Sequence, residues 1–153
     1  MNCLNYMELK LIKLTELIAG KFDLKETTEI LEKMFVTYKV KPKVVWNNDT
    51  KRYAHYDFDR NIMYVSKKLN KNTKTFLHTI LHEIKHAVDT KKMGKKKFVL
   101  AYETEQNMIA QGYYKDKHDP YSDNKFEIAA EKFAKKQYGH WKKALSKSKQ
   151  MRF

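Results

Sequence analysis

Cysteine and long apolar runs are scarce in this sequence, and each scarcity excludes a class of protein. Cys3 is the only cysteine, which excludes an internal disulfide and a zinc knuckle built from several thiolates. No stretch approaches the roughly 18 consecutive apolar residues of a transmembrane helix, so we expect no membrane segment. Charged residues interrupt the apolar positions of residues 1–20, so we expect no signal peptide and a cytoplasmic protein.

Arginine is also scarce, since Arg52, Arg60 and Arg152 are the only arginines in a chain of net charge +14. Arginine is preferred for base reading and bidentate phosphate contacts, so this lysine-rich charge only weakly indicates a nucleic-acid site. Lysine with abundant asparagine and tyrosine is typical of AT-rich coding, as in a low-GC bacterium or its phage, with the virion as an alternative location. We therefore expect dispersed lysines and weak, non-specific nucleic-acid binding. A functional charge would instead gather Lys91, Lys92, Lys95–Lys97 and the lysines of 142–149 around one groove.

The sequence does contain what one folded domain requires. Its 153 residues are 42 % apolar and 13 % aromatic, which is enough for a single hydrophobic core and unlike a disordered chain. We expect one domain over residues 1–139 and a loosely ordered basic tail over 140–153.

Hydrophobic periodicity and turn residues predict helices, then a small sheet, then helices. The order predicts an α+β domain with N-terminal helices within 1–38 and a sheet within 40–66. The expected elements are helices over 7–19 and 24–38, a strand over 40–46, a hairpin of 53–58 and 62–65, and helices over 73–91, 98–111 and 123–138.

The segment His82-Glu83-Ile84-Lys85-His86 within the third of these helices is an HExxH motif. Residues four apart share one face of a helix, so His82 and His86 can bind one metal ion. Glu83 then lies beside the ion, where it can act as the general base that takes a proton from water. The motif falls on a helix with a wide apolar stripe, directly after a hairpin, which strengthens this interpretation.

A catalytic zinc ion needs a third protein ligand, and the last helix offers one. Glu127 and Glu131 lie four residues apart beside an apolar stripe, where two carboxylates are costly unless a positive group receives them. We expect Glu127 to bind the metal and Glu131 to accept a hydrogen bond from a ligating histidine. The metzincin arrangement is excluded, because Asp89 and Lys92 stand where it needs glycine and histidine.

The two motifs together resemble the gluzincin pattern, in which a second helix supplies a glutamate ligand. The segment Glu127-x-x-Ala130-Glu131-x-Phe133-Ala134 and the small size are most similar to the ImmA/IrrE group and related compact bacterial and phage metallopeptidases, over residues 50–138. This resemblance implies a zincin-like fold and a zinc ion held by His82, His86 and Glu127. It also implies that strand 62–65 is the sheet edge to which an extended substrate adds. The chain departs from the pattern at Lys85, where that group commonly has glycine, and at Glu131, where thermolysin-like enzymes have aspartate.

Several other residues are alternatives for the site. Asp89 could replace Glu127 as third ligand, and His78 could support the site or contact substrate. One of the tyrosines between the two ligand helices could stabilise the oxyanion. The tyrosines considered for this role are Tyr113, Tyr114 and Tyr121. Weaker candidates for the site are His118, His140 and Glu103.

The expected function is hydrolysis of a peptide or protein substrate by zinc-activated water, with Glu83 as general base. One rival is a nucleic-acid-associated protease of the SprT-like type, which typically carries a third histidine or a cysteine-rich knuckle. The other rival is a phage structural or interaction protein that keeps zinc for stability alone. Glu83 argues against that second rival, because a purely structural site needs no base.

Overall fold

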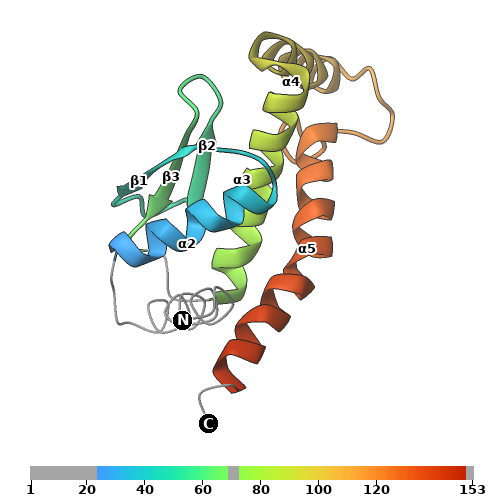
Figure 1. The fold of residues 1–153 in the computed structure, drawn as a ribbon. Coiled ribbons are helices and arrows are strands. Elements are labelled where there is room, and N and C mark those ends of the chain that lie inside the picture. Colours follow the sequence, from blue (N-terminus) through green and yellow to red (C-terminus); the bar gives the residue numbers. More distant parts are fainter. Residues whose placement is uncertain (1–23, 69–72, 151–153) are drawn as a thin grey trace.

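The computed structural model describes residues 24–68 and 73–150 and has the expected α+β architecture (Figure 1). The helix expected over 7–19 lies outside the described residues. Within them, no helix is both long enough and apolar enough to cross a bilayer. In chain order the elements are α2 (Leu24–Thr37), β1 (Lys43–Asn47), β2 (Ala54–Asp57), β3 (Ile62–Ser66), α3 (Thr73–Met93), α4 (Lys95–Ala110) and α5 (Lys125–Gln150).

The sheet has three strands in the order β1-β3-β2, with β1 parallel and β2 antiparallel to β3. β1 begins directly after Pro42 and is an edge strand, as a proline at that point predicts. The hairpin of β2 and β3 closes through a turn in which the Asp57 carboxylate accepts from the N–H groups of Asp59 and Arg60. Asn61 completes the turn with a φ of 53°, a left-handed conformation that asparagine tolerates.

The expectation that β3 forms the free edge of the sheet is wrong. β3 pairs on both sides, with β1 and with β2, so its backbone groups are used within the sheet. The hairpin gives β3 one partner, and the parallel pairing with β1 gives it the second. β2 is therefore the edge strand that lies next to α3.

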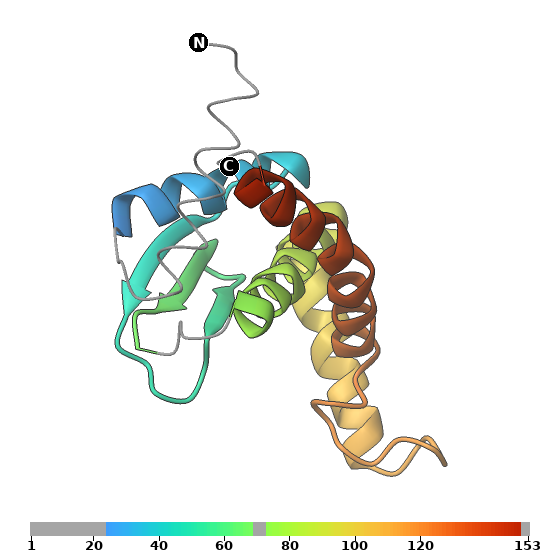
Figure 2. The same cartoon turned by 90° about the horizontal axis from the view of Figure 1, so that it is seen from below.

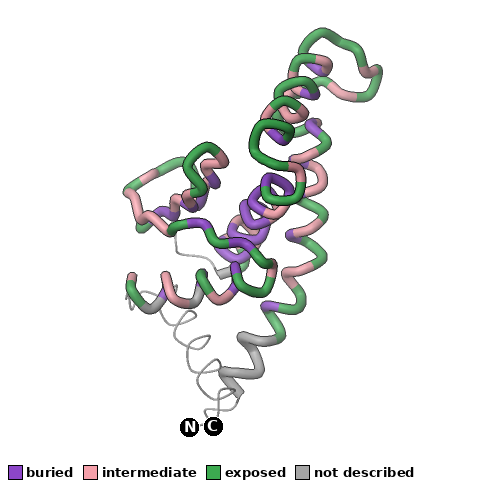
Figure 3. The backbone as a smooth tube through the Cα atoms, turned by 45° about the horizontal axis from the view of Figure 1, so that its top comes forward, coloured by how far each residue is buried: buried purple, intermediate pink, exposed green. Residues whose placement is uncertain are grey.

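One face of the sheet packs on the helices and forms the core. Met63 and Val65 of β3 are fully buried there, and Ala54 and Tyr56 of β2 lie on the same face. Figure 2 shows α3 between the sheet and α5, and Figure 3 shows buried residues concentrated along α3. The apolar stripe expected on this helix is buried as predicted, at Phe76, Leu77, Ile80, Leu81, Ile84 and Ala87.

Only Gly94 separates α3 from α4, so α4 begins at Lys95 and not at residue 98 as expected. Gly94 has a φ of 86°, and its carbonyl accepts the N–H of Phe98, so it precedes the first turn of α4. Lysines at a helix N-terminus oppose the helix dipole, so Lys95–Lys97 are unfavourable in the first turn of α4. Burial of the Phe98 side chain offsets that unfavourable charge placement.

Helix α5 continues through Gly139, where the sequence predicted its end, so residues 140–150 are helical and not a loose tail. Trp141 explains the difference. Its indole is buried and donates a hydrogen bond from Nε1 to the hydroxyl of Tyr38, at 2.7 Å. This tertiary contact outweighs the roughly 1 kcal/mol that a glycine costs inside a helix.

A candidate metal centre between two helices

The two histidines of the HExxH motif lie on the face of α3 that is turned toward α5. Four-residue spacing brings the rings together, and His82 Nε2 and His86 Nε2 are 3.2 Å apart. Both residues are buried, with exposed fractions of 9 % and 8 %. The imidazoles therefore present two nitrogen atoms to one small volume between the helices.

Glu127 in the first turn of α5 completes this group. Its Oε2 atom lies 2.8 Å from His82 Nε2, and its Oε1 atom lies 3.2 Å from His86 Nε2. Asn124 holds the start of the helix, because its side chain caps the N–H of Phe126 and donates to the carbonyl of Tyr102. The nitrogen and carboxylate atoms of His82, His86 and Glu127 all lie within 4.8 Å of one another, and such a group could hold a metal ion.

The electrostatics of this cluster favour an ionised carboxylate. Burial by itself would raise the pKa of Glu127, but hydrogen bonds with His82, His86 and Tyr102 lower that pKa far below its ordinary value. Burial would lower the pKa of His82, and the hydrogen bond to Glu127 and the nearby Glu83 charge raise it instead. Glu127 is thus an anionic oxygen donor beside two imidazoles, a ligand set typical of catalytic zinc.

Glu131 lies one turn further along α5 and joins two histidines of α3. Its Oε1 atom is 2.7 Å from His82 Nδ1, and its Oε2 atom is 2.9 Å from His78 Nε2. When Nδ1–H of His82 donates a hydrogen bond to this carboxylate, the proton stays on Nδ1, and Nε2 is free to bind a metal ion. His86 lacks this support, since its buried Nδ1 has no hydrogen-bond partner among the described residues.

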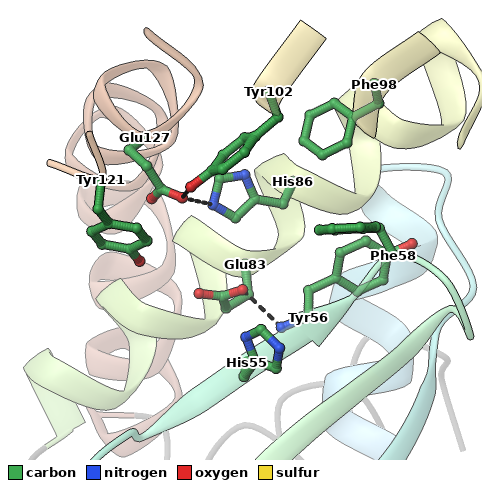
Figure 4. A pocket seen from close by; sticks show the side chains of 9 residues that line it. All are labelled: His55, Tyr56, Phe58, Glu83, His86, Phe98, Tyr102, Tyr121 and Glu127. Carbon is green, nitrogen blue, oxygen red and sulfur yellow. Dashed lines mark hydrogen bonds and ion pairs between the residues drawn. The ribbon is translucent and has the colours of Figure 1, made fainter. Parts of the chain in front are cut away.

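Glu83 is buried on the side of α3 that faces β2 (Figure 4). The backbone N–H of Tyr56 donates to its Oε2 atom at 2.8 Å, which ties the helix to the sheet edge. Burial raises the pKa of Glu83, although His86, His82 and the Tyr56 N–H lower it in part. A carboxyl group with a raised pKa is suited to accept and return a proton.

A cavity of about 110 Å³ opens beside these groups. Figure 4 shows Glu83 near its centre, with Glu127 and His86 on one side and His55 on the other. The cavity is lined by His55, Tyr56, Phe58, Glu83, His86, Phe98, Tyr102, Tyr121 and Glu127.

Two residues of this cavity were missed by sequence reasoning. The Tyr102 hydroxyl donates to Glu127 Oε1 at 2.7 Å, and His55 lines the cavity opposite Glu83. Tyr102 follows Phe98 by four residues on a predicted helix, and that shared face is the one signal that could have indicated it. His55 carries no comparable signal, because an isolated histidine in a strand has many ordinary roles.

The alternative ligands do not join the group. Asp89 is bound by Lys85, with its Oδ1 atom 2.5 Å from Nζ. His118 is exposed, and its backbone N–H is held by Asp123. The exposed His140 packs its ring on Trp141.

The three tyrosines considered for the oxyanion separate in the structure. Tyr114 donates to Glu105, on the far side of α4, and Tyr113 is largely exposed and packs on it. Tyr121 lines the cavity with 58 % of its surface exposed, and partial burial of its phenol together with the charges of Glu127 and Glu83 raises its pKa to about 12. Tyr121 therefore remains protonated at neutral pH and can donate a hydrogen bond.

No protein-family model, curated protein or solved structure matches this chain.

Proposed function

We propose that the chain is a zinc-dependent peptidase of the gluzincin type, related in arrangement to the compact ImmA/IrrE-like enzymes. His82, His86 and Glu127 would hold the ion, and Glu83 would be the general base. The observation that carries the proposal is the convergence of two imidazoles and a buried carboxylate, with Glu83 next to them in the same cavity.

The spacing of the donor atoms supports zinc as the ion. Zinc–ligand bonds of about 2.0–2.1 Å in a tetrahedral site separate neighbouring ligand atoms by roughly 3.3 Å. The two Nε2 atoms of His82 and His86 are 3.2 Å apart, and they lie 2.8 Å from Oε2 and 3.2 Å from Oε1 of Glu127, so the carboxylate would turn one oxygen toward the ion. An opening of a few tenths of an ångström would fit the ion, so the group is arranged for it in advance. Two nitrogen donors and one oxygen donor also match zinc in preference to calcium or magnesium.

A bound zinc ion would polarise the scissile carbonyl and lower the pKa of a water molecule to about 7. Glu83 would accept the proton from that water as it attacks and return it to the leaving amine. The N–H of Tyr56 orients the Glu83 carboxylate for this transfer. Tyr121 lies in the same cavity with a protonated hydroxyl, so it would donate to the oxygen of the former carbonyl.

The free edge of β2 supports a polypeptide substrate. The Ser66 N–H donates to the carbonyl of Tyr53, which lies opposite it across the antiparallel ladder. Because hydrogen-bonded and non-hydrogen-bonded pairs alternate along such a ladder, the odd-numbered residues of β2 direct their backbone groups toward β3. Ala54 and Tyr56 therefore direct their backbone groups outward. The Tyr56 N–H is used by Glu83, and the other outward groups of Ala54 and Tyr56 have no hydrogen-bond partner among the described residues, so an extended peptide could add there as another strand.

Metal analysis combined with a Glu83→Gln variant tests the proposal. Protein purified without chelator should contain about one zinc per chain, and it should cleave sites in a mixed peptide pool read by mass spectrometry. Glu83→Gln should keep the zinc and lose cleavage by about 10²–10⁴-fold, because a positioned general base contributes that much. Glu103→Gln on the exposed face of α4 is the matched control and should behave like the native chain. A zinc-free protein, or undiminished cleavage by Glu83→Gln, would refute the proposal.

A further inference from the structure

The cavity at the metal centre is the middle of a longer cleft along β2. On one side lies a cavity of about 390 Å³, which shares His55, Glu83 and Tyr121 with the central one. On the other side lies a cavity of about 510 Å³, which shares Tyr56 and Phe58 with it. Because neighbouring cavities share lining residues, the three follow one another along β2, and together they make up the cleft.

The cavity near the start of β2 has a basic rim. Lys51 and Arg52 line it, and both side chains are exposed. Arg52 is partly balanced by Asp49, 3.3 Å from its Nε atom, whereas Lys51 has no ion pair among the described residues. The acidic residues that line this cavity are Glu83, which accepts from the Tyr56 N–H, and Glu131, which is bound by His78 and His82.

The cavity at the hairpin end is basic as well. Lys41, Lys91 and Lys95 line it, and its one acidic residue is Asp59. Asp59 pairs with Lys95 at 3.3 Å, and Lys91 donates to the Lys39 carbonyl. Neither Lys41 nor Lys91 has a carboxylate partner in the part of the chain that the structure describes. The C-terminal dipole of α3 offsets some of this charge, yet two exposed lysines remain unbalanced.

The middle of the cleft has an apolar wall opposite its polar groups. Phe58, Phe98 and Tyr102 form its wall next to His86, and Phe98 contacts both Phe58 and the His86 ring. A side chain that enters here meets aromatic surface, so an apolar side chain gains most from burial.

From this pattern we propose that the cleft selects an extended peptide with an apolar side chain at the scissile bond and acidic side chains on both sides of it. The inference rests on the proposed function and names the substrate class of that site. β2 spans Ala54–Asp57 at about 3.3 Å per residue, and Arg52 and Asp59 lie just beyond its two ends, so the charged ends of the cleft lie about three residues on either side of His55 and Tyr56. The acidic side chains should lie at that distance from the scissile bond. Both ends of the cleft are basic, so the selection does not depend on the direction in which the peptide runs.

A peptide explains the cleft better than a nucleic acid does. The outward backbone groups of Ala54 and Tyr56 match a peptide strand, and the central cavity of about 110 Å³ suits an amino-acid side chain. Four of the five basic side chains at the two ends are lysines, which supply point charges, and Arg52 is the one arginine fork and is partly bound by Asp49.

Three fluorogenic peptides test the inference on the full-length, zinc-loaded chain. All carry Leu-Phe at the centre, and they differ only in having Glu, Gln or Lys about three residues away on both sides. At low salt the kcat/KM of the Glu peptide should exceed that of the Gln peptide about tenfold, with the Lys peptide slowest. High salt should reduce the difference, because the ion pairs between the peptide carboxylates and the basic side chains of the cleft would be exposed to solvent. In Lys41→Gln/Lys91→Gln/Lys95→Gln the Glu-to-Gln ratio should fall to about threefold or less, whereas Lys132→Gln/Lys136→Gln on the outer face of α5 should retain it.

Binding to the Glu83→Gln variant, followed by fluorescence anisotropy of labelled peptides, separates failure of this inference from failure of the proposed function. Cleavage of all three peptides at equal rates would overturn the charge selection and leave the peptidase standing. No cleavage, combined with tighter binding of the Glu peptide, would overturn the peptidase and leave the selection standing. No cleavage, combined with equal binding of the three peptides, would refute both the peptidase and the charge selection. Displacement of the Glu peptide by a single-stranded oligonucleotide of equal charge at lower concentration would overturn the inference in favour of a nucleic-acid groove.

Discussion

Glu127→Gln changes one atom of the proposed third ligand and leaves the shape of the site almost intact, so it isolates what the carboxylate charge contributes. The native carboxylate is 5 % exposed and contacts His82, His86 and the Tyr102 hydroxyl. The amide can still fill the space, but it carries no charge and is a poor zinc ligand. The prediction is a loss of zinc affinity without loss of the fold.

The expected size follows from linkage between binding and folding. Free zinc at 1,000 times its Kd stabilises a protein by about 4.1 kcal/mol. Loss of an outer hydrogen-bond partner costs 10–100-fold in affinity, so we take about 100-fold as the minimum for a direct ligand. The same zinc concentration would then stabilise Glu127→Gln by about 1.4 kcal/mol. For a chain of this size, the missing 2.7 kcal/mol or so lowers the zinc-dependent rise in Tm by roughly 5–11 °C.

Calorimetry with and without zinc, together with competition against a chelating dye, measures both quantities. The difference between the two Tm values is the readout, because the amide also alters the zinc-free site. Asp89→Asn is the control, since Asp89 was the alternative ligand and is held by Lys85 instead. An unchanged zinc Kd in Glu127→Gln, or a loss of zinc affinity in Asp89→Asn, would refute the proposal that Glu127 is the third ligand.

Three further predictions concern one group beside the site, His78, and two groups that stabilise the fold, Glu105 and Trp141. His78→Ala should raise the zinc Kd by up to about tenfold in the dye competition, because Glu131 then holds His82 less firmly, while His140→Ala should not. Burial would raise the pKa of Glu105, but the hydrogen bond from Lys117 lowers that pKa below the ordinary 4.5. The ionised Glu105 therefore stabilises the fold above about pH 4.5, and this stabilisation is lost as the pH falls through the lowered pKa. Urea unfolding of Glu105→Gln should therefore show lower stability at neutral pH and a flatter acid dependence. Trp141→Ala should lower the free energy of unfolding by about 3–5 kcal/mol in the same assay, and a loss below 1 kcal/mol would mean that the end of α5 is not docked.

Local periodicity by itself determined much of this protein. The 3.6-residue repeat predicted the buried stripe of α3 and placed His82 and His86 on one face of it, since both follow from the geometry of a single helix. The same reasoning on the last helix identified Glu127 and Glu131, because a carboxylate beside an apolar stripe needs a positive partner. The structure brings both residues to the histidines.

Other features were decided only by tertiary structure, because they depend on which elements become neighbours. The role of β2 as the free edge depends on a parallel pairing between β1 and β3, and no local pattern specifies that pairing. Tyr102 reaches Glu127 because α4 returns beside α5 after the turn at Gly94. The continuation of α5 past Gly139 depends on a contact between Trp141 and Tyr38, about a hundred residues apart in the chain. Contacts across such separations leave no periodic trace in the sequence, so the cleft around the metal centre exists only in the folded chain.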